Sequence, residues 1–268
     1  MSTANTYQAV RIGDIADWRL ICRIADDGMS AYLKHSDPMQ EVVTLFDEKW
    51  DTTSEQLLSK IENTVYDHPQ VLDDFSADIV IEAPKSIWVP LERVEDDEEK
   101  ASYLYNQVYK AEENDIMTDD VADACCLYCL VPGLKAFLQR TFPGARVHSH
   151  LALMARRFRE RNSDMPRVYA DIREGAADIL AFDNRNMLMA ATHTWHAPDD
   201  IQYHIWNIMN VYGLKPDETQ VSLSGLREVK NRLLGELRKN ISFVMLTMLP
   251  SLASKPGMAT SAALLLRL

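Results

Sequence analysis

The sequence predicts an α/β protein built from two halves that share the order strand, strand, strand, helix, strand, helix. Three observations support this fold class. The same succession of strand, turn and helix signals occurs twice. Matched features keep a nearly constant spacing: Gly175 lies 147 positions after Gly28, and Val221 lies 142 positions after Ile79. Apolar strands also alternate with helices, which indicates sheets covered on both faces.

The first half opens with three predicted strands in a meander, followed by a helix and a fourth strand. An Asp-Asp-Gly turn at residues 26–28 separates the first two strands. The helix carries its apolar residues on one face, namely Leu57, Leu58, Ile61 and Val65. In chain order, the strands are predicted at residues 18–24, 30–35 and 41–46, the helix at 54–66, and the last strand at 77–82.

The second half repeats this plan from residue 167 onward. An Arg-Glu-Gly turn at residues 173–175 separates its first two strands, and a helix begins at Pro198 and stops near Gly213. The strands are predicted at residues 167–172, 178–182, 187–194 and 220–224, followed by a helix at 226–240 and a strand at 242–247.

Five further elements lie between the two repeated parts and complete the first half. They are predicted as helices at 96–112 and 132–140, a strand at 121–130, and an extended segment at 146–150 that leads into a helix at 151–161. The resulting division is a first subdomain at 15–163, a second at 164–248, and a tail at 249–268. The tail has no element to pair with, so we expect it to be frayed.

Composition and charge exclude several classes of protein. With 47% hydrophobic residues the chain can bury a core, and no apolar run reaches the length of a membrane span. The net charge of −12 is uneven: residues 1–120 hold 27 acids and 10 bases, whereas residues 121–268 hold 13 acids and 18 bases. The acidic first half and the polar start, which lacks a signal pattern, predict a cytoplasmic protein that binds neither membrane nor DNA.

Cysteine and histidine pairs provide the candidates for metal chemistry. Cys126 and Cys129 form a C-x-x-C, but on a strand this spacing sends the two thiols to opposite faces, and there is no second such pair. We interpret them as small buried hydrophobic residues. The pairs His148 with His150 and His193 with His196 hold a metal only if the fold brings carboxylates to them. We therefore assign no metal site.

Three stretches resemble an uncharacterised bacterial family of unknown function with the actin-like ATPase (ribonuclease H-like) fold. They are residues 143–149, 199–208 and 221–225, and the resemblance covers roughly residues 15–248. The resemblance implies the fold of actin and the sugar kinases, in which ATP and Mg²⁺ bind between the halves. Two hairpin turns then approach the phosphates, an aspartate positions the metal ion, and a glycine-rich segment holds the adenosine.

The first of these implied turns corresponds to residues 26–30. Asp26, Asp27, Gly28 and Ser30 keep an acid, a glycine and a hydroxyl, which is compatible with phosphate binding. Any Asp-Gly hairpin turn has the same residues, so a turn that serves the fold alone is the simpler explanation.

The second implied turn departs from the pattern of active enzymes. Asp171 and Gly175 are present, but Arg173 replaces a glycine, alanines stand in place of the hydroxyl residues, and Glu174 would repel a phosphate. Ser224 and Gly225 are all that corresponds to the adenosine segment. We expect that nucleotide chemistry has been lost and assign no cofactor.

Two arginine-rich helices suggest a further class of partner. One carries Arg156, Arg157, Arg159 and Arg161, and the other carries basic residues between positions 227 and 239. Aromatic residues are sparse around them, so solvated helix faces explain them better than RNA binding. The sequence thus predicts a pseudo-ATPase acting as an interaction or scaffold protein with a protein partner. The alternatives are an atypical protein that binds ATP and Mg²⁺, and an RNA-associated accessory protein.

Overall fold

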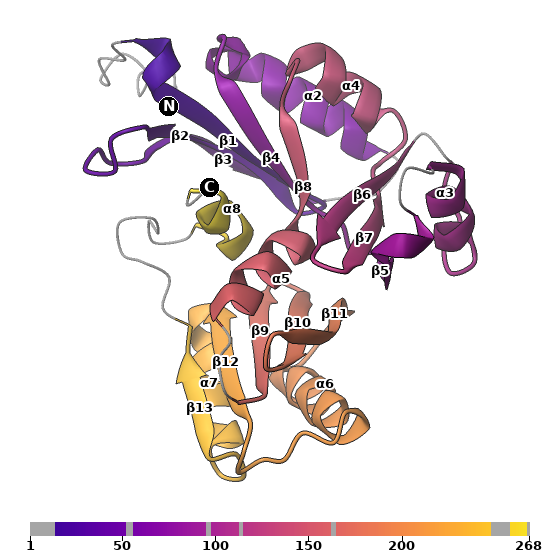
Figure 1. Ribbon diagram of the computed structural model, residues 1–268. Helices are drawn as coiled ribbons and strands as arrows, with labels where there is room; N and C mark the ends of the chain where they lie inside the picture. Colours follow the sequence, from indigo (N-terminus) through magenta and orange to yellow (C-terminus); the bar gives the residue numbers. More distant parts are fainter. Residues whose placement is uncertain are drawn as a thin grey trace.

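Two five-stranded sheets form the framework of the protein (Figure 1). The computed structural model describes residues 14–51, 56–94, 98–112, 115–161, 165–247 and 258–266. The strands of the first sheet are β1 (Trp18–Ala25), β2 (Gly28–His35), β3 (Val43–Lys49), β4 (Ser76–Glu82) and β8 (Arg146–Ser149). The strands of the second are β9 (Arg167–Arg173), β10 (Ala176–Asp183), β11 (Asn186–Thr194), β12 (Gln220–Gly225) and β13 (Phe243–Leu246).

The two sheets have the same strand order and the same directions. The order is β3-β2-β1-β4-β8 in the first and β11-β10-β9-β12-β13 in the second. In each sheet the strands of the opening meander pair antiparallel. β4 and β12 then join the central strands β1 and β9 in parallel, and β8 and β13 extend the sheets in parallel beyond them. β1 and β9 therefore occupy equivalent central positions, as the repeated order of elements predicts. The predicted α/β fold class is confirmed.

Helices lie between and after the strands, and a crossover between parallel strands usually contains one. They are α2 (Leu57–Asp67), α3 (Glu98–Asn106), α4 (Leu134–Thr141), α5 (His150–Arg161), α6 (Pro198–Val211), α7 (Arg227–Leu237) and α8 (Thr260–Leu265). Short 3₁₀ turns lie at η1 (Ile15–Asp17), η3 (Pro69–Leu72) and η4 (Leu91–Arg93). In the part of the chain that the structure describes, no helix is long and apolar enough to cross a membrane.

The structure also contains a third, small sheet that the sequence analysis did not predict. Its order is β5-β7-β6, formed by β5 (Ser86–Pro90), β6 (Ile116–Val121) and β7 (Ala124–Cys129). The strand predicted at 121–130 corresponds to β7, but its start was placed too early and β6 was not predicted, because β6 and β7 form a hairpin that turns at Ala122. Ala122 has a φ of 56°, a value that normally indicates glycine, asparagine or aspartate, so the turn left no recognisable signal.

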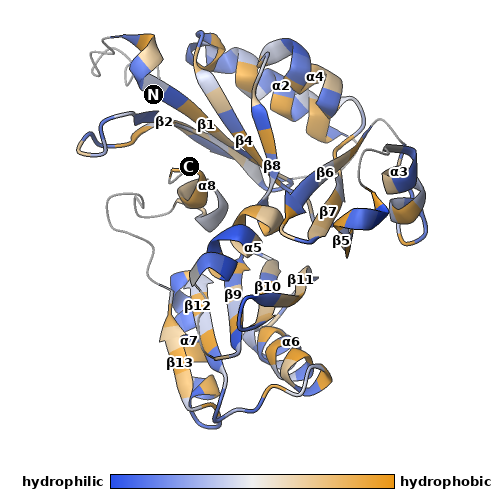
Figure 2. Cartoon of the chain, viewed as in Figure 1, coloured by the Kyte–Doolittle hydropathy of each residue, from blue (hydrophilic) through white to orange (hydrophobic). Residues whose placement is uncertain are grey.

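Helix α5 joins the cores of the two halves. It packs against β4 and β8 of the first sheet and against β10 and β11 of the second. Its N-terminal part is apolar and its C-terminal part hydrophilic (Figure 2). Phe158 of α5 is 1% exposed and stacks on Tyr169 of β9 with ring centroids 3.9 Å apart. The first core therefore continues into the second half through this helix.

The predicted frayed tail is wrong for residues 258–266, whereas residues 249–257, 267 and 268 lie outside the described residues. Residues 260–265 form α8, and every side chain from Thr260 to Leu266 is buried. The helix packs against β1, β4 and α5, and Figure 1 shows it between the first sheet and α5. Its partners lie far away in the sequence, so no local pattern could reveal that this segment is ordered.

We expect Phe158→Ala to lower the free energy of unfolding by about 3–5 kcal/mol, because it removes a buried ring that both halves contact. Tyr203→Ala, which truncates a ring that is 65% exposed on α6, should change it by less than about 0.5 kcal/mol. Urea unfolding followed by circular dichroism measures both. Equal losses in the two variants would show that α5 does not join the cores.

Candidate functional site

The two hairpin turns selected from the sequence lie close together where the halves meet. Asp26 and Asp27 form the turn between β1 and β2, and Glu174 and Gly175 form the turn between β9 and β10. Arg173, at the end of β9, reaches Glu82 at the end of β4, the strand beside β1. The structure thus brings the predicted residues of both halves to one place, which we call the junction.

Three buried charged side chains, Arg23, Glu82 and Asp178, form the centre of the junction together with Arg173, whose side chain is 16% exposed. We call these four residues the junction cluster. Arg23 donates from Nε to Oε1 of Glu82 at 2.8 Å and from Nη2 to Oε2 at 2.6 Å. Arg173 donates from Nη1 to Oε2 of the same carboxylate at 2.9 Å. Glu82 therefore accepts from arginines of both halves.

Arg173 uses its remaining nitrogens within its own half. Nε donates to Oδ2 of Asp178 at 2.8 Å, and Nη2 donates to Oδ1 at 2.9 Å. This fork-to-fork arrangement is the strongest pairing available to a guanidinium. All three nitrogens of Arg173 thus donate to buried carboxylates, although the sequence suggested that the residue only displaced a glycine.

Further polar groups surround Asp178. Oγ1 of Thr192 donates to its Oδ1 at 2.7 Å. His150, which is fully buried, places Nε2 3.1 Å from the same oxygen and Nδ1 3.2 Å from the carbonyl oxygen of Ile81. His150 begins α5, so the hydrogen bonds of the cluster continue into the helix that joins the two cores.

The cluster determines the charge of its carboxylates. Burial alone would raise the pKa of Glu82, but the charges of Arg173 and Arg23 outweigh it and hold the pKa at about 2. Burial likewise opposes ionisation of Asp178, yet His150 and Arg173 keep its pKa well below the usual range. Both carboxylates are therefore ionised and neutralised by groups of the protein itself.

Asp171, which the sequence assigned to the second implied turn, lies next to the cluster in a different environment. Ser224 donates to its Oδ1 at 2.5 Å, and Thr260 of α8 donates to the same oxygen at 2.6 Å. Burial raises the pKa of Asp171, and the two hydroxyl donors only partly oppose this. Ser224, a residue of β12 that is 5% exposed, is thus a partner of Asp171.

Helix α8 also contacts the cluster directly. Oγ of Ser261 donates to Oε1 of Glu82 at 2.5 Å. Thr260 and Ser261 therefore place adjacent hydroxyls on carboxylates that come from different halves. Neither residue was predicted from the sequence to belong to the site.

The remaining predicted residues have roles within the fold. A Cβ on Gly28 would lie 2.3 Å from the carbonyl oxygen of Glu48, and one on Gly225 would lie 2.0 Å from that of Ile172, so both glycines allow strands to approach closely. Gly175 has a φ of 68° and supplies the turn. Ser30 is 1% exposed on β2.

The first turn is negatively charged. Asp27 accepts from Nη2 of Arg23 at 2.8 Å and keeps 48% of its side chain exposed. Burial, and next the charge of Asp27, raise the pKa of Asp26, which the charge of Arg173 opposes. A phosphate at this place would meet these carboxylates, while the nearby guanidinium groups already donate to Glu82.

Sequence reasoning missed Arg23, Glu82 and Asp178, and it considered His150 only as half of a candidate metal pair. One signal was available for two of them: Arg23 and Glu82 are charged residues within otherwise apolar strand segments, which normally occur only where a partner is buried nearby. The identity of the partner was not available, because Glu82 and Arg173 lie 91 positions apart.

The other candidates from the sequence are the cysteine pair, the possible metal ligands and the arginines of α5. Burial raises the pKa of the Cys126 thiol to about 12 and that of Cys129 to about 11, so these cysteines are not poised for redox chemistry. Among the described residues, no group of three or more His, Cys, Asp or Glu side chains is arranged to hold a metal ion.

The arginines of α5 have partners within the protein. Arg156 pairs with Asp119, Arg157 with Glu160, and Arg159 with the carbonyl oxygen of Arg185.

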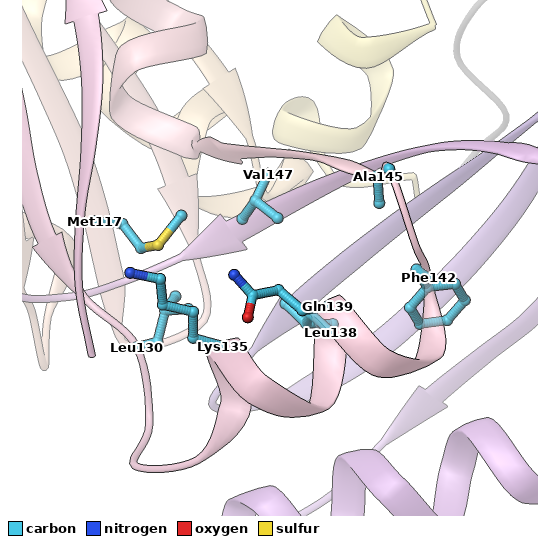
Figure 3. Close-up of a pocket in the computed structure, with 9 residues that line it drawn as sticks. Met117, Leu130, Lys135, Leu138, Gln139, Phe142, Ala145 and Val147 are labelled. Atoms are coloured by element: carbon cyan, nitrogen blue, oxygen red, sulfur yellow. The ribbon is translucent and has the colours of Figure 1, made fainter. Parts of the chain in front are cut away.

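A separate pocket of about 220 Å³ opens beside α4 (Figure 3). Its wall is mainly apolar, with Met117, Leu138 and Val147, and the polar ends of Lys135 and Gln139 point toward it (Figure 3). None of the predicted site residues lines it. It is therefore a distinct feature of the first half.

Comparison with solved structures identifies the fold. A crystal structure of a Bacteroides thetaiotaomicron VPI-5482 protein with an actin-like ATPase fold and unknown function matches with a TM-score of 0.82 at 20% identity, covering 97% of this chain and 99% of the other. The PilM-PilN type IV pilus biogenesis complex matches at 0.53 and 10% identity over 85% and 88%. EutJ, an ethanolamine utilization protein from Carboxydothermus hydrogenoformans, matches at 0.50 and 8% over 92% and 89%.

Comparison of sequences gives the family. No curated protein matches the chain. The family described as protein of unknown function (DUF3822) matches residues 8–244, which include both hairpin turns and the whole junction cluster. The chain, with its two equivalent sheets and an actin-like ATPase fold, belongs to the DUF3822 family.

Proposed function

We propose that the protein is a non-enzymatic interaction protein built on an actin-like ATPase fold. The observation that carries this proposal is the occupancy of the junction by the chain itself. Arg173 donates from all three guanidinium nitrogens to Glu82 and Asp178. Thr260 and Ser261 donate to Asp171 and Glu82. The polar groups that could contact a phosphate or a hydrated metal ion are thus paired with one another.

Electrostatics support the same conclusion. Glu82, Asp178 and Asp171 are each 3% exposed or less and lie beside the two turns. A nucleotide phosphate entering there would be repelled unless Arg23 or Arg173 left its carboxylate, and breaking a buried ion pair costs about 3–5 kcal/mol. Opening the junction for ATP therefore opposes the interactions that hold the halves together.

A protein partner is the form of activity that we propose for this fold. The PilM-PilN structure is a complex of two proteins, so the shared fold is compatible with assembly. For RNA binding the chain offers weaker support, because the arginines of α5 described above already pair within the protein. A binding surface for phosphates needs guanidinium groups that are available to them.

One observation favours a second candidate, an atypical ATP-binding protein. The structure does bring the two turns that carry Asp26, Gly28, Asp171 and Gly175 to one place, as an actin-like nucleotide site requires. In that case the ligand would have to displace α8 and reorganise Arg173. The two functions therefore differ in whether nucleotide stabilises the chain.

We expect Mg-ATP to leave the melting temperature unchanged, because the groups that would bind it are paired internally. Nucleotide at 100 times its dissociation constant would add about 2.7 kcal/mol to the free energy of unfolding, a readily measured shift. Differential scanning calorimetry with millimolar Mg-ATP, with MgCl₂ alone as the control, decides the point. A rise specific to Mg-ATP would overturn the non-enzymatic proposal in favour of the second candidate.

We expect the junction cluster to make the free energy of unfolding depend on pH in the acidic range. The pKa of Glu82 is lowered from 4.5 to about 2, so its contribution is fully present above pH 4.5 and is lost as the pH falls toward 2. This shift corresponds to a loss on the order of 3 kcal/mol. Glu82→Gln should be less stable at pH 7, because Arg23 and Arg173 lose a charged partner, and should lose less stability on acidification.

Chemical unfolding at a series of pH values between 2 and 7 measures this dependence. Glu236→Gln serves as the matched control, because Glu236 pairs with Lys239 on the surface and its side chain is 45% exposed. Its effect should stay below about 1 kcal/mol at every pH. Parallel stability profiles for the wild type and Glu82→Gln would show that the cluster does not hold the halves together.

A further inference from the structure

The segment Met258–Leu266 behaves structurally as a ligand of the rest of the chain. Its helix, α8, has only six residues, whereas isolated helices shorter than about 12 residues are marginal in water. Thr260 to Leu266 are nevertheless all buried, with exposed fractions of 5% or less. The surrounding protein therefore imposes the helical conformation on this segment.

The site that receives the segment has a polar end and an apolar wall. At the polar end, Asp171 accepts from Thr260 and Glu82 accepts from Ser261. The wall is formed by β1, β4 and α5, against which Ala262, Leu264 and Leu265 join the first core. We call this combination the α8 site; Figure 1 shows its occupant lying between the first sheet and α5.

The contacts define which segments can fit. Each carboxylate accepts a short hydroxyl hydrogen bond, and a buried carboxylate that loses such a donor is costly to leave unsatisfied. The two alanines that follow are 0% and 2% exposed, so larger side chains would meet the wall. The site thus selects adjacent hydroxyl residues followed by small and then branched apolar residues on one short helix.

We propose that the α8 site is a peptide-binding site for a helical segment of another protein chain with this pattern, and that Met258–Leu266 is its intramolecular ligand. This inference deepens the proposed function, on which it rests, because it names the place and the chemistry of partner recognition. A tethered segment acts at an effective concentration of about 1 mM. An external segment therefore binds when the internal one is weakened or when its own contacts are better.

The test uses the full chain and a fluorescein-labelled peptide with the sequence of residues 258–266. In the variant Thr260→Val with Ser261→Ala, the internal segment loses both hydroxyl donors. We expect the labelled peptide to bind this variant at least tenfold more tightly than the wild type in fluorescence anisotropy titrations, because each hydrogen bond to a charged group favours binding by about tenfold or more. A peptide with the same Val and Ala replacements should bind at least tenfold more weakly.

Thr219→Val is the matched control. Thr219 is fully buried, and its hydroxyl has no hydrogen-bond partner among the described residues, so the change removes a buried hydroxyl away from the α8 site. This variant should bind the peptide like the wild type. Binding to the double variant that does not depend on the peptide's hydroxyl residues would overturn the proposal, as would no binding at 1 mM peptide.

A second measurement keeps the test independent of the double variant's stability. A protease recognition sequence inserted within residues 250–257 allows the segment to be cut from the otherwise wild-type chain. After dilution, labelled peptide should exchange into the cut protein, and unlabelled peptide should compete. Failure to exchange in protein that retains its near-ultraviolet circular dichroism would overturn the site, whereas stabilisation by Mg-ATP would overturn the non-enzymatic function; the two failures are read separately.

Discussion

The carboxylate of Glu82 is the contact on which the arrangement of the two halves depends. It accepts hydrogen bonds from Arg23 of the first half, Arg173 of the second and Ser261 of α8, and its side chain is completely buried. Such a charge is stable inside a protein only when its partners surround it. The strand ends, the hairpin turns and α8 must therefore all be in place together.

This constraint explains why a fold associated with nucleotide binding here has a junction that is closed by protein groups. Arg173 places positive charge where the second phosphate turn would lie, but its guanidinium group is paired with the carboxylates of Glu82 and Asp178. Helix α8 then supplies hydroxyls and apolar side chains beside them. The combination of charged donors and acceptors with an adjoining apolar wall is the basis on which we propose a polypeptide partner rather than a nucleotide.

Much of the fold could be predicted because strands, turns and helices leave local patterns. The Asp-Asp-Gly turn at 26–28 and the apolar face at Leu57 and Ile61 are examples, and β1, β2 and α2 lie where these patterns indicate. The hairpin of β6 and β7 was missed because Ala122 turns the chain without a glycine. Asp171 and Arg173 were recognised as unusual, but their partners were not, since a departure from a pattern does not reveal what compensates for it.

The amino-acid order alone thus determined the succession of strands in the two five-stranded sheets, the equivalence of these sheets and the absence of the usual small residues in the second turn. These properties depend on residues two to four positions apart, which interact through the geometry of strands and helices. Only the tertiary structure decided that Arg173 pairs with Glu82, 91 positions away, and that Ser261 reaches the same carboxylate across 179 positions. Contacts over such distances arise from the packing of whole sheets and helices, which places two distant residues together only after every intervening element has found its position.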